Sequence, residues 1–322
     1  MNKQRIVLLG SAGTGTAFAA ACALRRVWSQ SVGLIAMDIN PRHLVTTALL
    51  ADHYEQAPLS AAPEFARTLT EILRQHRVDT YQPFFPEEIA LAARMRANGG
   101  IGAAVTVIAP PVEASTGCAD KWRLGQWLSQ SGVPIPQTAP ATAPFLADEY
   151  FLKPNNGSGS RGARKITAGE LAGWPGAAAA GWIVQEICVG PEVTVDAFYD
   201  PASGFHQMVC RERIEIKSGV TTKARLFADE GLQRLALAIA QALGLAGSFC
   251  FQVMRNAAGW AVTDVNPRPG AATAMCALTG NDFFAAAFAR CWGEDPQPFF
   301  RPLQGDHFVT RQYAEFLTGG PA

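Results

Sequence analysis

The chain has 322 residues, of which 48% are hydrophobic and 17% are charged, a composition typical of globular proteins and unlike that of disordered ones. Its 27 lysines and arginines balance its 27 aspartates and glutamates, so the surface as a whole attracts neither nucleic acid nor anionic membranes, and any anion-binding site must be local. The length predicts two domains rather than one.

The first third of the chain alternates predicted strands and helices. Apolar runs predict buried strands at RIVLL (5–9), GLIAMD (33–38), VDTYQPF (78–84) and VTVIAP (105–110). Helical spacing predicts helices between them at AFAAACALRRVW (17–28), PEFARTLTEILRQH (63–76) and EEIALAARMRA (87–97). This alternation is typical of a parallel, doubly wound α/β sheet, and we expect a Rossmann-like domain over residues 1–110.

The rest of the chain begins with an amphipathic helix, KWRLGQWLSQSG (121–132), which the prolines of VPIPQT close. A second long helix is predicted at 229–244. β-type runs surround that helix, at YFLKP (150–154), GWIVQEI (181–187), EVTVDAFYD (192–200), HQMVCRERIEI (206–216), SFCFQVM (248–254) and WAVTDVNPRPG (260–270). This order predicts an α+β domain over residues 111–322, with APATAPF (139–145) as a connection and AGWPGAAAAG (172–181) as a flexible loop.

The turn after the first strand holds Gly10, Gly13 and Gly15, where backbone amides at a helix N-terminus can bind a phosphate. Asp38 ends the next strand, the position from which a dinucleotide-binding protein holds a ribose. The spacing is GxxGxG, however, and not the GxGxxG of that motif. NAD binding is one hypothesis for this turn; the other is that the glycines only let the chain turn tightly into the helix.

A loop rich in glycine and serine follows the strand at 150–154. The stretch FLKPNNGSGSRGARK (151–165) places Lys153 at the end of an apolar run and further basic residues after the loop. A lysine holds phosphate oxygens as a point charge, and a pliable Gly/Ser loop can fold over a triphosphate with several N–H donors. The pattern is not GxxxxGK[ST], which excludes a P-loop. The stretch is therefore either half of a clamp on a polyanion or the tip of a hairpin.

The stretch WAVTDVNPRPG offers the other half of such a clamp. Along a strand, Asp264, Asn266 and Arg268 would share one face. The first two supply hard oxygen ligands suited to Mg²⁺, and the arginine can neutralise charge on a transferred phosphoryl group. Gln252, on the preceding strand, offers another oxygen. The alternative is a strand end capped by Asn-Pro.

Two glutamates, Glu186 and Glu192, flank the connector in VQEICVGPEVTVD (184–196). A nucleotide could lie against the backbone there, with its ribose hydroxyls bound by a carboxylate. The alternative is that both are solvated turn residues.

The seven cysteines are scattered and form no CxxC pair, which argues against a zinc site or a redox pair. Reduced, packed thiols are typical of a cytoplasmic protein, which we expect here. The first apolar run is too short for the core of a signal peptide, and no apolar run approaches the roughly 18 residues of a membrane span.

Taken in order, these segments resemble the ATP-grasp superfamily, especially the members like the large subunit of carbamoyl-phosphate synthetase. CADKWRLGQWLSQSGVPIPQT (118–138) is similar to the family's lead-in helix and places Lys121 at a position that contacts nucleotide phosphate. Lys153 matches the second basic phosphate contact. The loop with Ser158, Gly159 and Ser160 matches the flexible part of a lid, which the resemblance places at about 140–190.

The same resemblance assigns the remaining site residues. Glu186 and Ile187 match the hinge beside the adenine, Glu192 the ribose-binding carboxylate, and Lys217 a basic contact near the nucleotide. Asp264 and Asn266 match an E-x-N pair of metal ligands, and Arg268 the arginine after it.

Two departures from the family pattern concern the metal. The usual ligand glutamate is the shorter Asp264, and another metal-side position falls on Cys250, a poor ligand for Mg²⁺ that Gln252 would replace. The N-terminal part resembles the Rossmann-like domain that precedes the ATP-grasp fold in this family, with Glu88 at its acidic position.

The resemblance implies an ATP-dependent ligase. ATP, with Mg²⁺ or Mn²⁺, would phosphorylate a small-molecule carboxylate, and an amine would attack the acyl phosphate to release ADP and phosphate. Lys153 and Arg268 would neutralise the transferred charge. The implied partners are the acid and the amine; apolar faces favour a homodimer.

Two other functions remain open at this point. One is a non-catalytic ATP-binding protein, in which Asp264 and Cys250 mark a degraded metal centre. The other is an NAD-dependent oxidoreductase that uses GSAGTG and Asp38, which leaves the second half of the chain unexplained.

Overall fold

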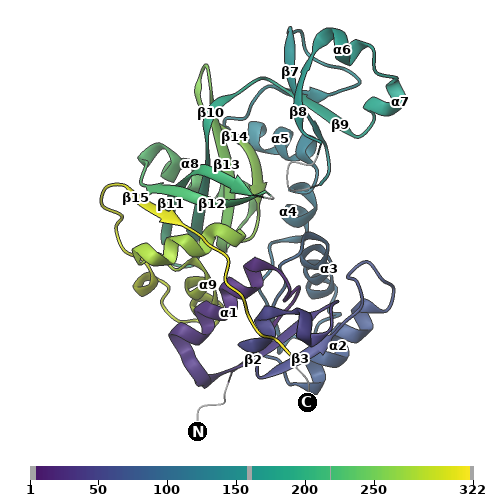
Figure 1. Ribbon diagram of the computed structural model, residues 1–322. Helices are drawn as coiled ribbons and strands as arrows, with labels where there is room; N and C mark the ends of the chain where they lie inside the picture. The colour runs from purple at the N-terminus through teal and green to yellow at the C-terminus, as the bar shows by residue number, and fades with distance from the viewer. Residues whose placement is uncertain (1–4, 158–161, 218, 320–322) are drawn as a thin grey trace.

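A computed structural model describes residues 5–157, 162–217 and 219–319. Within them the chain forms three β-sheets that lie in different parts of the molecule (Figure 1). The first sheet lies at the bottom of the view, the largest at the left, and the smallest at the top right.

The first sheet is parallel and has the strand order β3-β2-β1-β4-β5. Its strands are β1 (Arg5–Leu9), β2 (Val32–Asp38), β3 (His53–Gln56), β4 (Thr80–Gln82) and β5 (Thr106–Val107). The connections contain α1 (Gly15–Trp28), α2 (Phe65–Gln75), α3 (Pro86–Ala97) and the short 3₁₀ turns η1 (Ser29–Ser31), η2 (Arg42–Leu44) and η3 (Thr46–Leu49). The expected Rossmann-like fold is confirmed.

Apolar side chains alternate between the two faces of this sheet, as they must in a sheet that is covered on both sides. Leu8 and Tyr81 pack toward α2 and α3 on one face. Val7 and Leu9 pack toward α1 on the other, in a cluster that also contains Phe288. Phe288 belongs to α9 (Phe283–Cys291), so a helix from the far end of the chain completes the core of the first sheet.

Two helices, α4 (Val112–Gly117) and α5 (Lys121–Gln130), lead to the smallest sheet, which is antiparallel with the order β6-β9-β7-β8. Its elements are β6 (Thr138–Pro140), β7 (Glu149–Pro154), β8 (Arg164–Thr167), β9 (Trp182–Gln185), α6 (Ala168–Ala172) and α7 (Gly176–Ala179). It has a small core of its own, in which Leu152 and Val184 are fully buried.

The largest sheet is antiparallel, with the order β14-β13-β10-β11-β12-β15. Its strands are β10 (Val189–Tyr199), β11 (His206–Lys217), β12 (Val220–Phe227), β13 (Gly247–Asn256), β14 (Gly259–Asn266) and β15 (His307–Thr310). One face packs on α8 (Glu230–Leu243) and α5. The other packs on η4 (Ala271–Thr279), α9 and residues near η5 (Gln297–Phe299).

After β15 the chain returns to the first sheet, as the yellow trace past α1 shows in Figure 1. The ring of Phe316 meets that of Phe18 of α1 edge-on, with 5.7 Å between the ring centroids. The Thr318 hydroxyl then donates to the carbonyl oxygen of His43 at 2.6 Å. The last described residues therefore tie the largest sheet to the first one.

Three local expectations were wrong, and one strand was missed. Strand β3 was not predicted, because it is polar and lies at a sheet edge. The supposed connection 139–145 begins inside β6, an edge strand where Pro140 is tolerated. The supposed flexible loop 172–181 contains the short helix α7. Arg268 lies beyond the end of β14, because Pro267 cannot continue the ladder.

Among the described residues, no helix combines the length and the apolar character needed to cross a membrane.

Candidate nucleotide-binding site

Lys153 joins the smallest sheet to the largest one. It lies near the end of β7, is only 8% exposed, and donates from Nζ to the carbonyl oxygen of Thr263 of β14 at 2.9 Å. Burial lowers the pKa of its ammonium group to about 8, while the neighbouring carboxylates of Asp264 and Glu192 oppose that shift and Lys121 adds to it. These side chains, which lie far apart in the sequence, therefore act electrostatically on one buried cation.

Lys121 is held against the chain that follows β7. It is the first residue of α5, and its Nζ donates to the carbonyl oxygen of Gly157 at 2.7 Å. Its backbone N–H donates to the carbonyl oxygen of Asn155 at 3.0 Å, and the Asn155 side chain accepts from Trp122 N–H at 2.8 Å. The start of α5 and the start of the Gly/Ser loop thus form one unit. The predicted residues Ser158, Gly159 and Ser160 lie outside the described part of the chain.

Glu186 lies just after β9, where the smallest sheet passes into the largest. Its backbone N–H donates to the carbonyl oxygen of Gln137 at 2.9 Å, and its carboxylate accepts from the Asn256 side chain at 2.6 Å. Ile187 and Cys188 follow and are partly buried. Burial and the charge of Glu186 raise the pKa of the Cys188 thiol, while Lys153 opposes the shift. This segment therefore faces the surroundings of Lys153.

Glu192 forms an ion pair at the start of β10. Arg213 donates from Nη1 to its carboxylate at 2.5 Å, and from its other nitrogens to Thr221 and to the carbonyl oxygen of Gly219. Arg213 was not predicted from the sequence, because only the β10–β11 register brings it beside Glu192.

The three predicted metal ligands lie together on the paired strands β13 and β14. Gln252 is directly opposite Asp264, and Cys250 is directly opposite Asn266, so these side chains point to one face. All but Cys250 are partly exposed, and none of the described cations forms an ion pair with Asp264.

This donor set fits Mg²⁺. A single carboxylate with two amide oxygens is the kind of partial shell that Mg²⁺ completes with water and substrate phosphates. No group of three His, Cys, Asp or Glu side chains in the described chain could enclose a metal by itself. Burial raises the pKa of the Cys250 thiol to about 12, and sulfur is a soft ligand that suits Mg²⁺ poorly.

Arg268 and Lys217 differ in their placement. Arg268 lies two residues beyond the end of β14 and donates from Nη1 to the carbonyl oxygen of Pro269 at 2.9 Å. Lys217 is exposed at the end of β11, where its Nζ lies 3.7 Å from the Glu215 carboxylate. The structure brings Lys217 into contact with none of the other predicted site residues that it describes.

In the glycine-rich turn after β1, backbone N–H groups are already occupied by hydrogen bonds within the protein. The N–H groups of Gly10 and Ala12 donate to carbonyl oxygens of β4 and β2, and that of Gly13 donates to the Asp38 carboxylate at 2.7 Å. Asp38 also accepts from the Asn40 side chain. These groups stabilise the turn and are not free for a pyrophosphate or a ribose, which argues against the NAD hypothesis.

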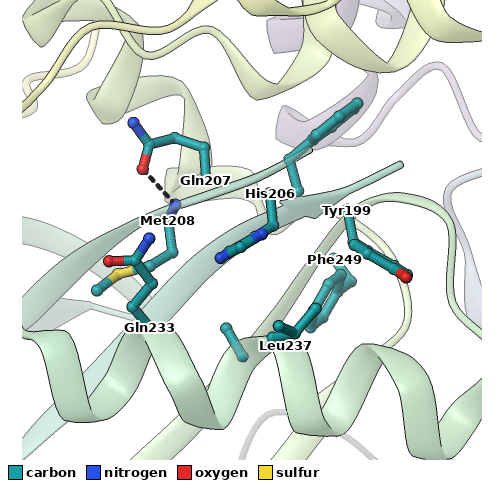
Figure 2. A pocket seen from close by; sticks show the side chains of 9 residues that line it. Tyr199, His206, Gln207, Met208, Gln233, Leu237 and Phe249 are labelled. Carbon is teal, nitrogen blue, oxygen red and sulfur yellow. Dashed lines mark hydrogen bonds between the residues drawn. The ribbon is translucent and has the colours of Figure 1, made fainter. Parts of the chain in front are cut away.

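Two surface features lie near these elements. Figure 2 shows a depression between α8 and the β10–β11 hairpin, lined by residues such as Tyr199, His206 and Gln233; it has no space for a water molecule and contains no predicted site residue. An open groove of about 550 Å³ runs along α5 past Trp122 and reaches Glu186.

The comparisons with known proteins agree with this geometry. A family model described as an ATP-grasp domain matches residues 118–272, a range that contains Lys121, Lys153, Glu192 and Asp264. Residues 118–272 therefore form an ATP-grasp domain. No curated protein matches the sequence. The finer resemblance to carbamoyl-phosphate synthetase stays a prediction.

Solved structures share the fold of this chain at low sequence identity. N5-carboxyaminoimidazole ribonucleotide synthetase from Thermus thermophilus matches with a TM-score of 0.69 and 17% identity, over 90% of this chain and 78% of that one. L-amino acid ligase from Bacillus licheniformis matches with a TM-score of 0.70 and 13% identity, over 90% and 75%.

A third neighbour was solved with ligands. The biotin carboxylase domain of 2-oxoglutarate carboxylase from Hydrogenobacter thermophilus matches with a TM-score of 0.71 and 14% identity, over 96% of this chain and 75% of that one. Its structure is described as a dimer in complex with MgADP, ADP and bicarbonate. At these identities the likeness establishes the ATP-grasp fold and no more.

Proposed function

We propose that this protein is an ATP-dependent ligase, which activates a small-molecule carboxylate as an acyl phosphate for attack by an amine and releases ADP and phosphate. The observation that carries the proposal is the hydrogen bond between Lys153 Nζ and the Thr263 carbonyl oxygen, across 110 residues of sequence. It joins the strand with the phosphate-binding lysine to the strand with the oxygen ligands. The ATP-grasp fold and the ligases among its structural neighbours support the same reaction.

The predicted site residues suggest which part of the substrates each side chain would bind in such a reaction. Lys121 and Lys153 bind the phosphates of ATP, Glu192 binds the ribose, and the segment at Glu186 and Ile187 borders the adenine. Bound at Asp264, Asn266 and Gln252, Mg²⁺ would screen the phosphate charges. Arg268 lies at the end of the same strand, where it can stabilise charge on the phosphoryl group in transfer. Lys217 remains a proposed nucleotide contact.

Direct phosphoryl transfer requires positioning and charge neutralisation more than covalent help from the protein. Burial of Lys153 in a region that also contains Asp264 and Glu192 provides both, because buried charges interact more strongly than solvated ones. A homodimer and a cytoplasmic location stay predictions.

The proposal is tested by release of phosphate from ATP with paired panels of acids and amines. Lys153→Ala and Asn266→Ala should each lower turnover by at least about 100-fold while the circular dichroism spectrum and the melting temperature stay close to those of the parent protein. Lys223→Ala is the control, because Lys223 is an exposed lysine of the largest sheet that donates to Glu215 and to no predicted site residue. Near-normal turnover in both site variants would reject the site.

A non-catalytic ATP-binding protein is the second candidate, and one observation favours it. The position opposite Asn266 is Cys250, whose soft sulfur suits Mg²⁺ poorly. ATP binding by calorimetry without phosphate release across the whole panel would support this candidate over the ligase.

A further inference from the structure

The arginines of the described chain separate into two groups by their partners. Of those whose residues are partly or fully buried, six have a carboxylate within 4.0 Å, and two, Arg268 and Arg311, have none. The six paired ones are Arg5, Arg25, Arg211, Arg213, Arg225 and Arg290. Arg268 lies within the range that the family model matches, residues 118–272, and Arg311 lies outside it.

The same short turn holds both unpaired arginines. Arg268 Nη1 donates to the carbonyl oxygen of Pro269 at 2.9 Å, and Arg311 Nη2 donates to that of Ala271 at 2.7 Å. These two carbonyl groups flank Gly270, whose N–H donates to the Thr273 hydroxyl at 2.8 Å. Each guanidinium is thus fixed by one contact, and its other N–H groups have no acceptor among the described residues.

Arg311 is also fixed through its backbone. It is the first residue after β15, and its N–H donates to the carbonyl oxygen of Thr222 at 2.7 Å. Its side chain therefore leaves the edge of the largest sheet and points to the turn that follows the metal-binding strand. Across that turn lies the start of α1, where a Cβ on Gly15 would come 3.9 Å from Cβ of Ala271.

The charges near Arg311 leave it without compensation. Arg211 is the nearby cation, and its own charge is balanced by the buried Asp196 carboxylate at 2.9 Å. Burial and the Arg211 charge both lower the pKa of Arg311. A partly buried cation without a counter-ion is unfavourable, so a ligand that supplies an anion here would be bound strongly.

Under the proposed function, Arg268 is occupied by the phosphoryl group in transfer, and Arg311 is left for another anion. We propose that Arg311 binds a second oxyanion of the acid substrate, so that this acid carries, besides the carboxylate that is phosphorylated, a further carboxylate or a phosphate ester. This proposal rests on the proposed ligase function for the identity of the first group. Arginine suits such a site because its planar fork matches an oxyanion with two parallel hydrogen bonds.

The test is calorimetric titration of the full chain, with and without MgADP. The probes are malonate, succinate, glutarate and adipate, each beside its monomethyl ester, and phosphoglycolate as the phosphate arm. At least one doubly anionic acid should bind more tightly than its singly anionic counterpart. Arg311→Gln should weaken that binding about 10- to 100-fold and leave the ester's binding unchanged, because one charged contact is lost.

Two further variants make the result specific. Arg311→Lys should recover part of the affinity, since it keeps the charge but loses the fork. Arg301→Gln is the control, because Arg301 is exposed and also donates only to carbonyl oxygens, those of Pro298 and Phe300. It should bind the acid like the parent protein.

The outcomes separate the two proposals. Equal affinities of Arg311→Gln and Arg301→Gln, or no binding by any doubly anionic probe, would overturn the Arg311 site even if MgADP binds normally. The parent protein could instead bind no MgADP and still bind the acid in a way that depends on Arg311. That result would overturn the proposed ligase function and keep the anion site.

Discussion

At the scale of single residues, Glu88 is a buried carboxyl group. No cation among the described residues forms an ion pair with it. It is 2% exposed, accepts from the Tyr81 hydroxyl at 2.5 Å and bonds to the Ser11 hydroxyl. Burial raises its pKa to about 7. Ser11 has a φ of 45°, an uncommon value for a residue other than glycine, and the contact with Glu88 helps to fix this turn.

This carboxyl group should make stability depend on pH. Its folded pKa of about 7 lies above its ordinary value of 4.5, so its contribution is fully present below pH 4.5 and is lost as the pH rises through 7. Relative to Glu88→Gln, which does not titrate, the parent protein should lose up to about 3 kcal/mol of unfolding free energy over this window. Urea denaturation at several pH values measures this loss of unfolding free energy. If the unfolding free energies of the two proteins changed with pH in parallel, the prediction would be contradicted.

Lys153 should make nucleotide binding depend on pH as well. With its pKa lowered to about 8 by burial, part of its population is neutral above that pH, and a bound phosphate would favour the charged form. Binding of MgADP near pH 8 to 9 should therefore take up protons. Calorimetry in buffers with different ionisation enthalpies detects this uptake, and Lys153→Ala should abolish it if any binding remains.

At the scale of elements, a buried ion pair between β10 and β11 also contacts η4 and holds it in place. Arg211 of β11 donates to both carboxylate oxygens of Asp196 of β10. The hydroxyl of Thr273, in η4, bonds to the same carboxylate, and the Cys276 thiol lies 3.5 Å from it. Because η4 begins directly after Gly270, this cluster positions the turn that Arg268 and Arg311 hold.

Arg211→Met should therefore destabilise the protein by about 3–5 kcal/mol, because it leaves the Asp196 charge buried without a partner. Adding Asp196→Asn should recover part of this loss, since the uncompensated charge is then removed. Chemical denaturation gives both values. As a control, Arg234→Met removes an exposed pair with Glu230 at 4.0 Å and should change stability by less than about 0.5 kcal/mol.

At the scale of the whole molecule, the two ends of the chain share one core. Phe284 and Phe288 of α9 belong to the same cluster as Val7, Leu9 and Leu24 of the first sheet and α1. The N-terminal helix also contacts η4, so the first sheet and the largest sheet are joined by packed apolar side chains. The division at residue 110, with a lid over about 140–190, stays a prediction about domains.

Phe288→Ala should test this shared core. Phe288 is 1% exposed, and truncation of such a ring costs about 3–5 kcal/mol. Because the ring joins both parts, we expect one cooperative transition that moves as a whole to lower denaturant concentration. Leu278→Ala, at a 76% exposed position of η4, should leave the midpoint within error. Two separate transitions, of which only one moves, would refute the shared core.

The sequence predicted those parts of the molecule that local patterns encode. The strands at 5–9, 192–200 and 248–254 have apolar runs, and the helix at 229–244 has strong amphipathic spacing, so all four were recognised. Strand β3 is polar and gains its place only from pairing with β2, which no local pattern reveals.

The candidate site was predictable to the same limit. Lys153 and Asp264 were predicted because each lies in a recognisable stretch, FLKPNNGSGSRGARK for Lys153 and WAVTDVNPRPG for Asp264. Arg311 did not, because its stretch HFVTRQYAEF has no pattern and its partner, the carbonyl oxygen of Ala271, lies 40 residues away. Thr263 was missed for a similar reason, since it contributes only a backbone oxygen.

The packing of α9 on the first sheet also bears on how the molecule is made. A ribosome delivers all five strands of that sheet long before it reaches Phe284 and Phe288. Until then the nascent sheet would expose part of one apolar face, the kind of surface that chaperones bind and that promotes aggregation. Completion of the core of the first sheet must therefore wait until α9 has been made, although all five strands of that sheet precede α9 in the sequence.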